Sequence, residues 1–342
     1  MEYRSLGRTG VQVSALCLGC MNFGGVTPED ESINIMHRAL DEGINFFDTA
    51  NVYSRGISEE VTGKALKGRR DRVVLATKVH GRMADDDVLA AGNNRRHIIE
   101  QCEASLKRLG TDYIDLYQIH RPQSTVPVDE MLRALDDLIR AGKVRYIGTS
   151  SFAAWQVMEA LWASKELGLN RFISEQPPYH LLDRSIEREL IPMAQTYGLA
   201  ILPWSPLARG FLSGKYKRGE DIPGDSRFAQ DSKRGALFNE RLKQHFSDLS
   251  YNVLDVIGTL AAQKNKTTAQ VALAWVMRQP GVTSPIIGPR TMAHLEDNLG
   301  AVEIRFSDDD YARIDAVAQP EQAVVPYYHG AMMDFKPSQH RW

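Results

Sequence analysis

The chain has 342 residues, of which 43% are hydrophobic and 25% are charged, and its 41 basic and 43 acidic residues leave a formal charge of −2. These proportions are typical of soluble globular proteins, and the length suits one large α/β domain or two ordinary ones. The balanced charge argues against nucleic acid or an anionic membrane as a partner. The segment MEYRSLGRTG lacks the apolar core of a signal peptide, and no apolar run approaches the roughly 20 residues that cross a bilayer. We therefore expect a cytoplasmic protein.

The first predicted element is a hairpin, because two β-prone stretches flank Gly7-Arg8-Thr9-Gly10 in YRSLGRTGVQVSA. A series of short, apolar, β-rich runs follows, alternating with helical patterns. The eight runs begin near Leu16, Asn45, Val73, Tyr113, Val144, Phe172, Leu199 and Thr283. Six of the seven intervals between them lie close to the roughly 31 residues per unit of a (β/α)8 barrel. Runs that are nearly continuous in apolar residues are typical of a parallel sheet covered by helices.

Helix signals stand between these runs. Thr27-Pro28, followed by acids, predicts a cap and a first turn ahead of SINIMHRALDEG. Asn94 precedes RRHIIEQCEASLKRLG, which ends at Gly110, and Thr267 precedes AQVALAWVMRQ.

The structural rival to a barrel is an open doubly wound sheet. Such a sheet has about five or six strands and a glycine-rich first turn, whereas LGCMNFGG does not match G-x-G-x-x-G. We therefore predict one domain over residues 1–342, a (β/α)8 TIM barrel of the α/β class, with the hairpin capping its bottom.

Two segments fall outside the repeat. Residues 209–248, a polar stretch after the seventh strand, predict a long functional loop at the catalytic face, with disorder as the alternative. The tail after Gln319 has aromatic residues but no helical period. It could fold over the barrel mouth and contact substrate, or dock on the outside.

The spacing Cys17-Leu18-Gly19-Cys20 formally matches a metal-binding or redox C-x-x-C. Because side chains three apart on a strand face opposite sides, we interpret both cysteines as packing residues. We expect no metal site.

Polar residues at strand ends carry the information about function, because a barrel of this kind has its active site there. Asp48 and Tyr53 follow the second strand, Lys78 ends the third, and His120 follows the fourth. A lysine at the end of an apolar strand is costly unless a carboxylate pairs with it, and Asp48 is the candidate. Each residue alone also fits a structural role, as a cap, a packing residue or a core histidine. Together, on neighbouring strands, they predict a site.

This set can donate a proton to a carbonyl. A phenol is too weak an acid for efficient catalysis near neutral pH, but an ammonium about 4 Å away contributes about 4 kcal/mol toward its ionised form. Asp48 would hold Lys78 charged, and His120 would orient the substrate oxygen. No side chain can deliver hydride, so a nicotinamide cofactor is needed.

Long motifs in this order resemble the aldo-keto reductase superfamily over essentially the whole chain. They are GINFFDTANVYSRGISEEVTGKAL, TKVHGR, SLKRLGTDYIDLYQIH, SEQPPYH, PWSPLARGFLSGKY and IIGPRTMAHLEDNL. The resemblance places the family's catalytic tetrad on Asp48, Tyr53, Lys78 and His120. It implies reduction of an aldehyde or ketone to the alcohol, with NADPH extended across the barrel top.

The resemblance also implies which residues bind NADPH. Those beside the nicotinamide would be Gly19, Cys20, Met21, Ser150, Ser151, Gln176 and Trp204. Those along the pyrophosphate would be Ser205, Pro206, Leu207, Ala208, Gly210, Lys215 and Arg227. Those at the adenosine end would be Gly288, Arg290, Thr291, His294, Asp297 and Asn298, where His294 and Asp297 replace the family's common Gln and Glu. Arg290 suits a 2′-phosphate, which favours NADPH over NADH.

The motifs GFLSGKY and SRF resemble the branch of potassium-channel β-subunits and bacterial broad-range reductases. The alternative function is therefore a cofactor-binding regulatory subunit of the channel type. That group tends to carry Asn at the tetrad histidine, whereas this chain has His120, so we expect an enzyme.

Overall fold

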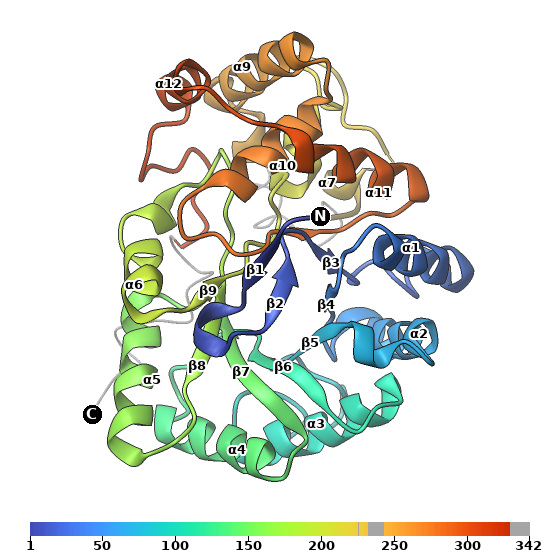
Figure 1. Ribbon diagram of the computed structural model, residues 1–342, viewed down its shortest axis with the longest axis vertical. Coiled ribbons are helices and arrows are strands. Elements are labelled where there is room, and N and C mark those ends of the chain that lie inside the picture. The colour runs from blue at the N-terminus through green and yellow to red at the C-terminus, as the bar shows by residue number, and fades with distance from the viewer. Residues whose placement is uncertain (225, 232–242, 329–342) are drawn as a thin grey trace.

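The computed structural model describes residues 1–224, 226–231 and 243–328, and its core is a ring of parallel strands surrounded by helices (Figure 1). The strands pair in the order β10-β3-β4-β5-β6-β7-β8-β9. Their bounds are β3 (Cys17–Gly19), β4 (Phe46–Asp48), β5 (Val74–Val79), β6 (Ile114–Ile119), β7 (Val144–Ser150), β8 (Phe172–Gln176), β9 (Ala200–Ile201) and β10 (Ile286–Ile287). The Ile286 N–H donates to the Pro203 carbonyl at 2.8 Å and closes the ring. The predicted (β/α)8 barrel is confirmed.

One main helix follows each strand and covers the outside of the sheet. These helices are α1 (Glu29–Asp41), α2 (Ile57–Leu66), α3 (Arg95–Leu109), α4 (Val128–Arg140), α5 (Ala154–Leu167), α6 (Leu190–Tyr197), α10 (Thr268–Arg278) and α11 (Met292–Leu299). Two further helices, α9 (Asp248–Lys264) and α12 (Asp308–Val317), pack against each other beside the ring. No helix within the described ranges is long and apolar enough to cross a membrane.

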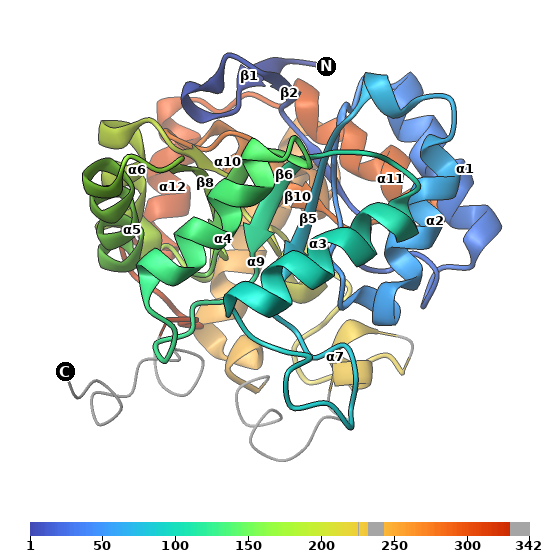
Figure 2. The same ribbon diagram turned by 90° about the horizontal axis from the view of Figure 1, so that it is seen from below.

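The predicted hairpin is present as β1 (Tyr3–Ser5) and β2 (Gln12–Ser14), an antiparallel pair. Leu6 and Val13 are fully buried in an inner core shared with Phe46 and Leu116. The hairpin therefore plugs the N-terminal end of the barrel. Figure 2 shows it at the end opposite α7 (Arg227–Asp231).

The helix signals were correct at two of the three starts. The Asn94 side chain accepts from the His97 N–H and caps α3, and the Thr267 side chain accepts from the Gln270 N–H and caps α10. The predicted cap at Thr27 was wrong, because the N-cap position of α1 is Pro28. The Thr27 hydroxyl instead donates to the Arg290 carbonyl at 3.1 Å, which ties the start of α1 to the loop after β10.

The C-x-x-C cysteines face opposite sides of β3, as predicted. Cys17 belongs to the inner core and Cys20 to the core between sheet and helices, and both are free thiols. Burial raises the pKa of Cys20 to about 12, which keeps the thiol protonated. The pair is a packing feature.

The polar stretch 209–248 is described in part, since residues 225 and 232–242 lie outside the described residues. Its described part is anchored by an aromatic cluster in which the ring of Phe228 lies 5.1 Å from that of Tyr216 and 5.0 Å from that of Phe246. Short helices α7 and Gln244–Phe246 belong to this stretch. These ring contacts fix the described part of the stretch beside the barrel.

Candidate active site

The four tetrad residues meet at the C-terminal end of the barrel. Asp48 is the last residue of β4, Lys78 lies near the end of β5, and His120 directly follows β6. The Lys78 ammonium forms an ion pair with the Asp48 carboxylate and lies 3.4 Å from the Tyr53 hydroxyl. The rings of Tyr53 and His120 meet edge to face at 5.6 Å. The structure thus brings together all four side chains that the sequence singled out.

Lys78 is fully buried, and its charge is held there by defined partners. Its ammonium donates to Asp48 and to the Thr49 carbonyl, the latter at 2.8 Å. Burial opposes the charge, but the attraction of Asp48 outweighs it, so the pKa of Lys78 is raised. A permanent positive charge therefore faces the Tyr53 hydroxyl.

Asp48 has two more partners, and the sequence analysis missed one of them. Its second carboxylate oxygen accepts from the Gln118 amide at 3.0 Å and from the Gln176 amide at 2.9 Å. Gln118 lies two residues before His120 on β6, so strand alternation already places it on the same inner face. Three charged or amide donors therefore fix the position of the Asp48 side chain.

Tyr53 is positioned by a tight turn after β4. It begins a short 3-10 helix (Tyr53–Gly56) in which Ser54 and Arg55 adopt left-handed backbone angles, with φ of 48° and 54°. Left-handed conformations cost non-glycine residues roughly 1 kcal/mol or more each. The exposed Arg55 side chain pairs with Asp85 at 2.9 Å, linking this turn to the loop after β5. The turn directs the phenol toward Lys78.

His120 is uncharged in this environment. Burial, together with the positive charges of Lys78 and Arg121, holds the pKa of His120 well below its usual range. A neutral imidazole can donate one hydrogen bond or accept one. It can therefore hydrogen-bond and orient a carbonyl oxygen without adding a second positive charge beside Lys78.

The residues predicted to face the nicotinamide lie beside the tetrad. The Ser150 hydroxyl donates to the Gln176 carbonyl at 2.9 Å, and the Ser151 N–H donates to the same oxygen at 3.1 Å. Both amide hydrogens of Gln176 are used, since its nitrogen donates to Asp48 and to Gln118. Only its amide oxygen remains for a ligand. Gly19 ends β3 and Cys20 directly follows it, with its side chain in the core and its N–H donating to the Asp48 carbonyl at 2.8 Å.

The described part of the C-terminal tail, residues 319–328, reaches the barrel mouth. The sequence leaves open whether the tail lies at the mouth or docks on the outside, and for this part the structure shows the mouth. Hydrogen bonds from Val324, Val325 and Tyr327 tie it to the loop after β8. The ring of Tyr327 lies 5.0 Å from that of Trp204, edge to face. Residues 329–342 lie outside the described residues.

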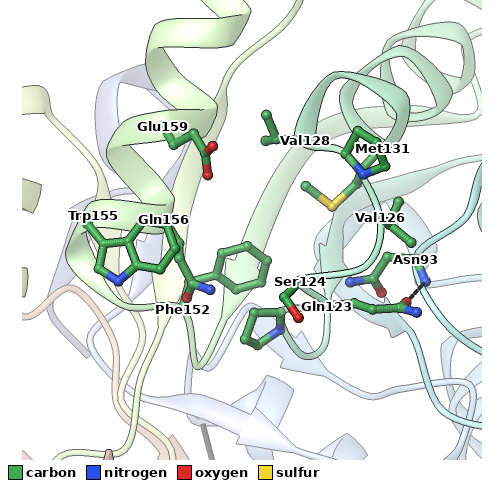
Figure 3. Close-up of a pocket in the computed structure, with 12 residues that line it drawn as sticks. Asn93, Gln123, Ser124, Val126, Val128, Met131, Phe152, Trp155, Gln156 and Glu159 are labelled. Atoms are coloured by element: carbon green, nitrogen blue, oxygen red, sulfur yellow. Dashed lines mark hydrogen bonds between the residues drawn. The ribbon is translucent and has the colours of Figure 1, made fainter. Parts of the chain in front are cut away.

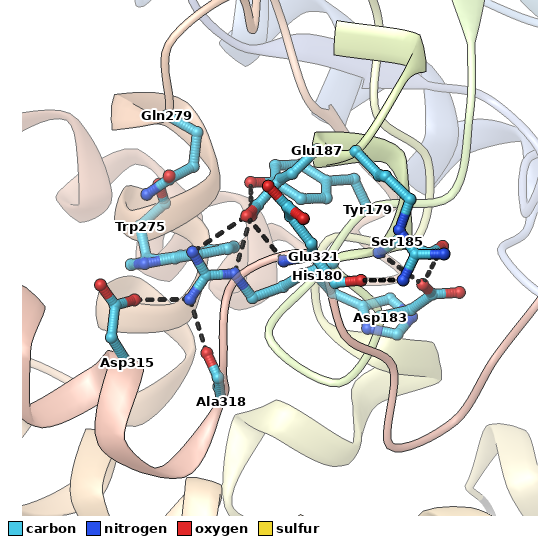
Figure 4. Close-up of polar contacts among 12 residues, drawn as sticks. Tyr179, His180, Asp183, Ser185, Glu187, Trp275, Gln279, Asp315, Ala318 and Glu321 are labelled. Atoms are coloured by element: carbon cyan, nitrogen blue, oxygen red, sulfur yellow. Dashed lines mark hydrogen bonds and ion pairs between the residues drawn. The ribbon is translucent and has the colours of Figure 1, made fainter. Parts of the chain in front are cut away.

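Arg184 anchors this part of the chain. Its guanidinium, 6% exposed, binds Glu187 at 2.7 Å, Asp315 and the Ala318 carbonyl, and lies 4.9 Å from the Trp275 ring. Figure 4 shows how Glu187, Asp315 and Ala318 converge beside Trp275. The anchor joins the loop after β8 to α12 and so to the tail.

The predicted pyrophosphate residues form a compact loop after β9. Ser205, Ala208 and Gly210 all have positive φ, and Gly210, at 89°, is where glycine is required. The loop holds its own shape, because the Ser205 hydroxyl accepts from the Arg209 N–H at 3.0 Å. Pro206 and Leu207 lie within it. From the insertion, Arg227 reaches Met21, with its guanidinium 3.8 Å from the sulfur.

The predicted adenosine end is positively charged. Burial and the nearby charges of Lys215 and Arg290 lower the pKa of His294. The Thr291 side chain caps α11 by accepting from the His294 N–H. Asp297 accepts from the Thr267 hydroxyl at 2.9 Å, Asn298 is buried, and the Gly288 carbonyl accepts from Asn22. Lysine and arginine are groups that bind phosphate, so Lys215 and Arg290 fit a dinucleotide phosphate. The first N–H of α11 is already used, since Met292 donates to the Glu31 carboxylate at 3.0 Å.

A separate pocket of about 380 Å³ lies between α4 and α5. Figure 3 shows Phe152, Trp155, Val128 and Met131 around it. None of the predicted site residues lines it. The described parts of the chain also contain no group of three His, Cys, Asp or Glu side chains that could hold a metal ion.

Known proteins resemble the chain along most of its length. The uncharacterized oxidoreductase YrpG of Bacillus subtilis (strain 168) is 42% identical over 323 residues, covering 90% of this chain and 93% of that protein. The versiconal hemiacetal acetate reductase of Aspergillus parasiticus is 36% identical over 91% of this chain and 95% of its own. A probable voltage-gated potassium channel subunit beta of Oryza sativa subsp. japonica is 37% identical, over 93% and 97% respectively. The model of the aldo/keto reductase family matches residues 15–319, and the chain belongs to that family.

Proposed function

We propose that the protein is an NADPH-dependent oxidoreductase that reduces an aldehyde or ketone to the corresponding alcohol. The observation that carries this proposal is the Tyr53 hydroxyl, 3.4 Å from the buried Lys78 ammonium, which is itself paired with Asp48. A phenol beside a fixed positive charge is a proton donor suited to a carbonyl oxygen. Oxidoreductases among the relatives support the same reaction class.

In this mechanism Tyr53 gives its proton to the carbonyl oxygen of the substrate. Lys78 stabilises the phenolate that is left, and Asp48 keeps the ammonium charged and aimed. His120, neutral and packed edge to face against Tyr53, hydrogen-bonds the substrate oxygen and sets its direction. The reduced nicotinamide, when bound, supplies hydride to the carbonyl carbon.

The cofactor would be held along the mouth by the residues that the motifs predict. Ser150, Ser151 and Gln176 would bind the carboxamide, and Trp204 would stack on the ring. The loop from Ser205 to Gly210, with Lys215 and Arg227, would bind the pyrophosphate. The positive cluster of Lys215 and Arg290, beside a His294 whose pKa they help to lower, supports a phosphorylated ribose, and hence NADPH over NADH.

The direct test is to mix the purified protein with NADPH and a panel of aldehydes and ketones, and to follow the loss of reduced-nicotinamide absorbance. The proposal predicts turnover with at least one class of carbonyl compound. Tight NADPH binding with no consumption in any mixture would contradict it. That result would favour the second candidate, a cofactor-binding channel subunit, which is supported by the relatives of that name.

A further inference from the structure

Arg121 lies between the predicted proton donor and the predicted nicotinamide side of the mouth. It directly follows His120, and its guanidinium donates to the Ser151 hydroxyl at 3.1 Å. The same guanidinium lies 5.6 Å from the centre of the Tyr327 ring, which in turn packs against Trp204. A guanidinium in this position borders the space that a substrate must enter to reach Tyr53.

The charge of Arg121 has no counterion among the described residues. No ion pair involves it there, whereas Lys78 is neutralised by Asp48. Burial lowers the pKa of Arg121, and nearby Tyr53, Tyr328 and Glu175 oppose that effect, but a guanidinium stays charged in proteins. Within the described part of the chain, the positive charge of Arg121 is therefore not cancelled by a carboxylate.

Two carboxyl groups of this region, Glu175 and Asp183, form no ion pair with Arg121. Glu175 is fully buried, and burial raises its pKa to about 8, so it is mostly protonated at neutral pH. Asp183 accepts from the Ser185 hydroxyl and, at 2.8 Å, from the Tyr327 N–H. Its contacts hold the tail in place.

The tail adds two hydroxyl groups to the same region. The phenolic oxygens of Tyr327 and Tyr328 are buried and have no hydrogen-bond partner among the described residues. Buried hydroxyls are normally satisfied, so a pair left open beside a guanidinium indicates a missing polar ligand. Arg121 keeps further N–H groups besides the one that binds Ser151, and a planar guanidinium matches a carboxylate with two parallel hydrogen bonds.

We propose that Arg121 binds a carboxylate of the substrate, so that the protein acts on aldehydes or ketones that also carry a carboxylate group. This inference rests on the proposed function and names its substrate class. Arg121 would orient such a substrate across the mouth, with its carbonyl at Tyr53 and its carboxylate toward Tyr327 and Tyr328.

The test compares kcat/KM for succinate semialdehyde with kcat/KM for its methyl ester, which removes the charge and adds one methyl group. The wild type should prefer the acid by about 10-fold or more, as expected for a hydrogen-bonded charge pair. Arg121→Gln should lower kcat/KM for the acid by about 10- to 100-fold and leave that for the ester within about threefold. Arg121→Lys should restore part of the preference. Arg133→Gln, on the outer surface of α4, is the control for net charge.

A structural role for Arg121 predicts a different result. If it only positions Ser151, Arg121→Gln should lower the rates for acid and ester equally and weaken NADPH binding, and that outcome would overturn the inference. Absence of any preference in the wild type would overturn it as well.

Calorimetric titration separates this inference from the proposed function. Butanoate, which cannot be reduced, should bind the wild type but not Arg121→Gln, with or without NADP⁺. If no carbonyl compound of the panel is turned over, the proposed function fails, and butanoate binding then decides the anion site alone. Equal binding of butanoate to the two proteins would contradict the assignment.

Discussion

Burial decides the protonation states at the mouth, and Glu175 shows this most directly. Among the described residues it forms no salt bridge. One carboxyl oxygen accepts from the Phe152 N–H at 3.0 Å, and the other is buried without a partner there. Desolvation then disfavours the ionised form, and the pKa rises from 4.5 to about 8. A carboxyl that is neutral here preserves the positive charge of Arg121.

Glu175→Gln should remove a pH-dependent destabilisation. Because the folded state binds this proton more tightly than the unfolded state, wild-type stability falls as pH rises from 4.5 to about 8. Relative to Glu175→Gln, the wild type should lose up to about 1.4 kcal/mol of its free energy of unfolding per pH unit in that window. Urea unfolding of both proteins across this range measures it, with exposed Glu166→Gln as the control. Parallel stability curves for wild type and Glu175→Gln would show that Glu175 is not buried as a neutral acid.

Neighbouring strand ends made part of the site predictable at the residue scale. The sequence predicts the pairing of Asp48 with Lys78, because a buried ammonium needs a carboxylate and because adjacent parallel strands end at one edge of the sheet. Arg121, Glu175 and Tyr327 were missed. Their importance comes from contacts across long stretches of sequence, such as Tyr327 on Trp204, which no local pattern encodes.

Helices and strands are predictable from the sequence wherever their signals depend only on neighbouring residues. The apolar runs predicted all eight strands of the barrel, and Asn94 and Thr267 cap their helices as expected. Thr27 failed as a cap because its hydroxyl donates to the Arg290 carbonyl in the neighbouring loop after β10. Tertiary contacts of this kind override a capping preference worth about 1 kcal/mol. The tail, which has no period, could be placed only by the structure.

Arg184 connects the elements that carry the tail, so Arg184→Leu should destabilise the protein by roughly 3–5 kcal/mol. The substitution leaves Glu187 and Asp315 without their shared partner and removes the contact with Trp275. Urea unfolding measures the change. The matched control is exposed Arg188→Leu, expected within about 0.5 kcal/mol of the wild type. Equal stability of the two variants would show that the buried network does not anchor α12.

At the scale of the molecule, the mouth runs from the tetrad to the positive cluster beside α11. The insertion and the tail both reach it, through Arg227 on Met21 and Tyr327 on Trp204. A ligand that spans the mouth would touch segments from both halves of the chain. Its binding therefore stabilises the whole fold, since any ligand specific for the native state shifts unfolding by mass action.

NADPH should raise the thermal midpoint of unfolding more than NADH at equal concentration. A ligand at 100 times its Kd adds about 2.7 kcal/mol of stability, and the charges of Lys215 and Arg290 would favour the phosphorylated cofactor. Arg290→Ala should reduce the NADPH shift toward the NADH shift and leave the NADH shift nearly unchanged. Thermal unfolding with each cofactor measures this. If the substitution diminished both shifts equally, Arg290 would not read the 2′-phosphate.

The most direct measurement is the rate of carbonyl reduction by Tyr53→Phe, with NADPH affinity determined in parallel by fluorescence titration. The substitution removes one hydroxyl, 3.4 Å from Lys78, and keeps the ring that packs against His120. The account predicts that reduction is abolished while NADPH affinity stays nearly intact, because the hydroxyl acts on the substrate. A variant that kept more than about a tenth of the wild-type rate, a loss of less than about 1.4 kcal/mol in transition-state stabilisation, would contradict the assignment of Tyr53 as proton donor.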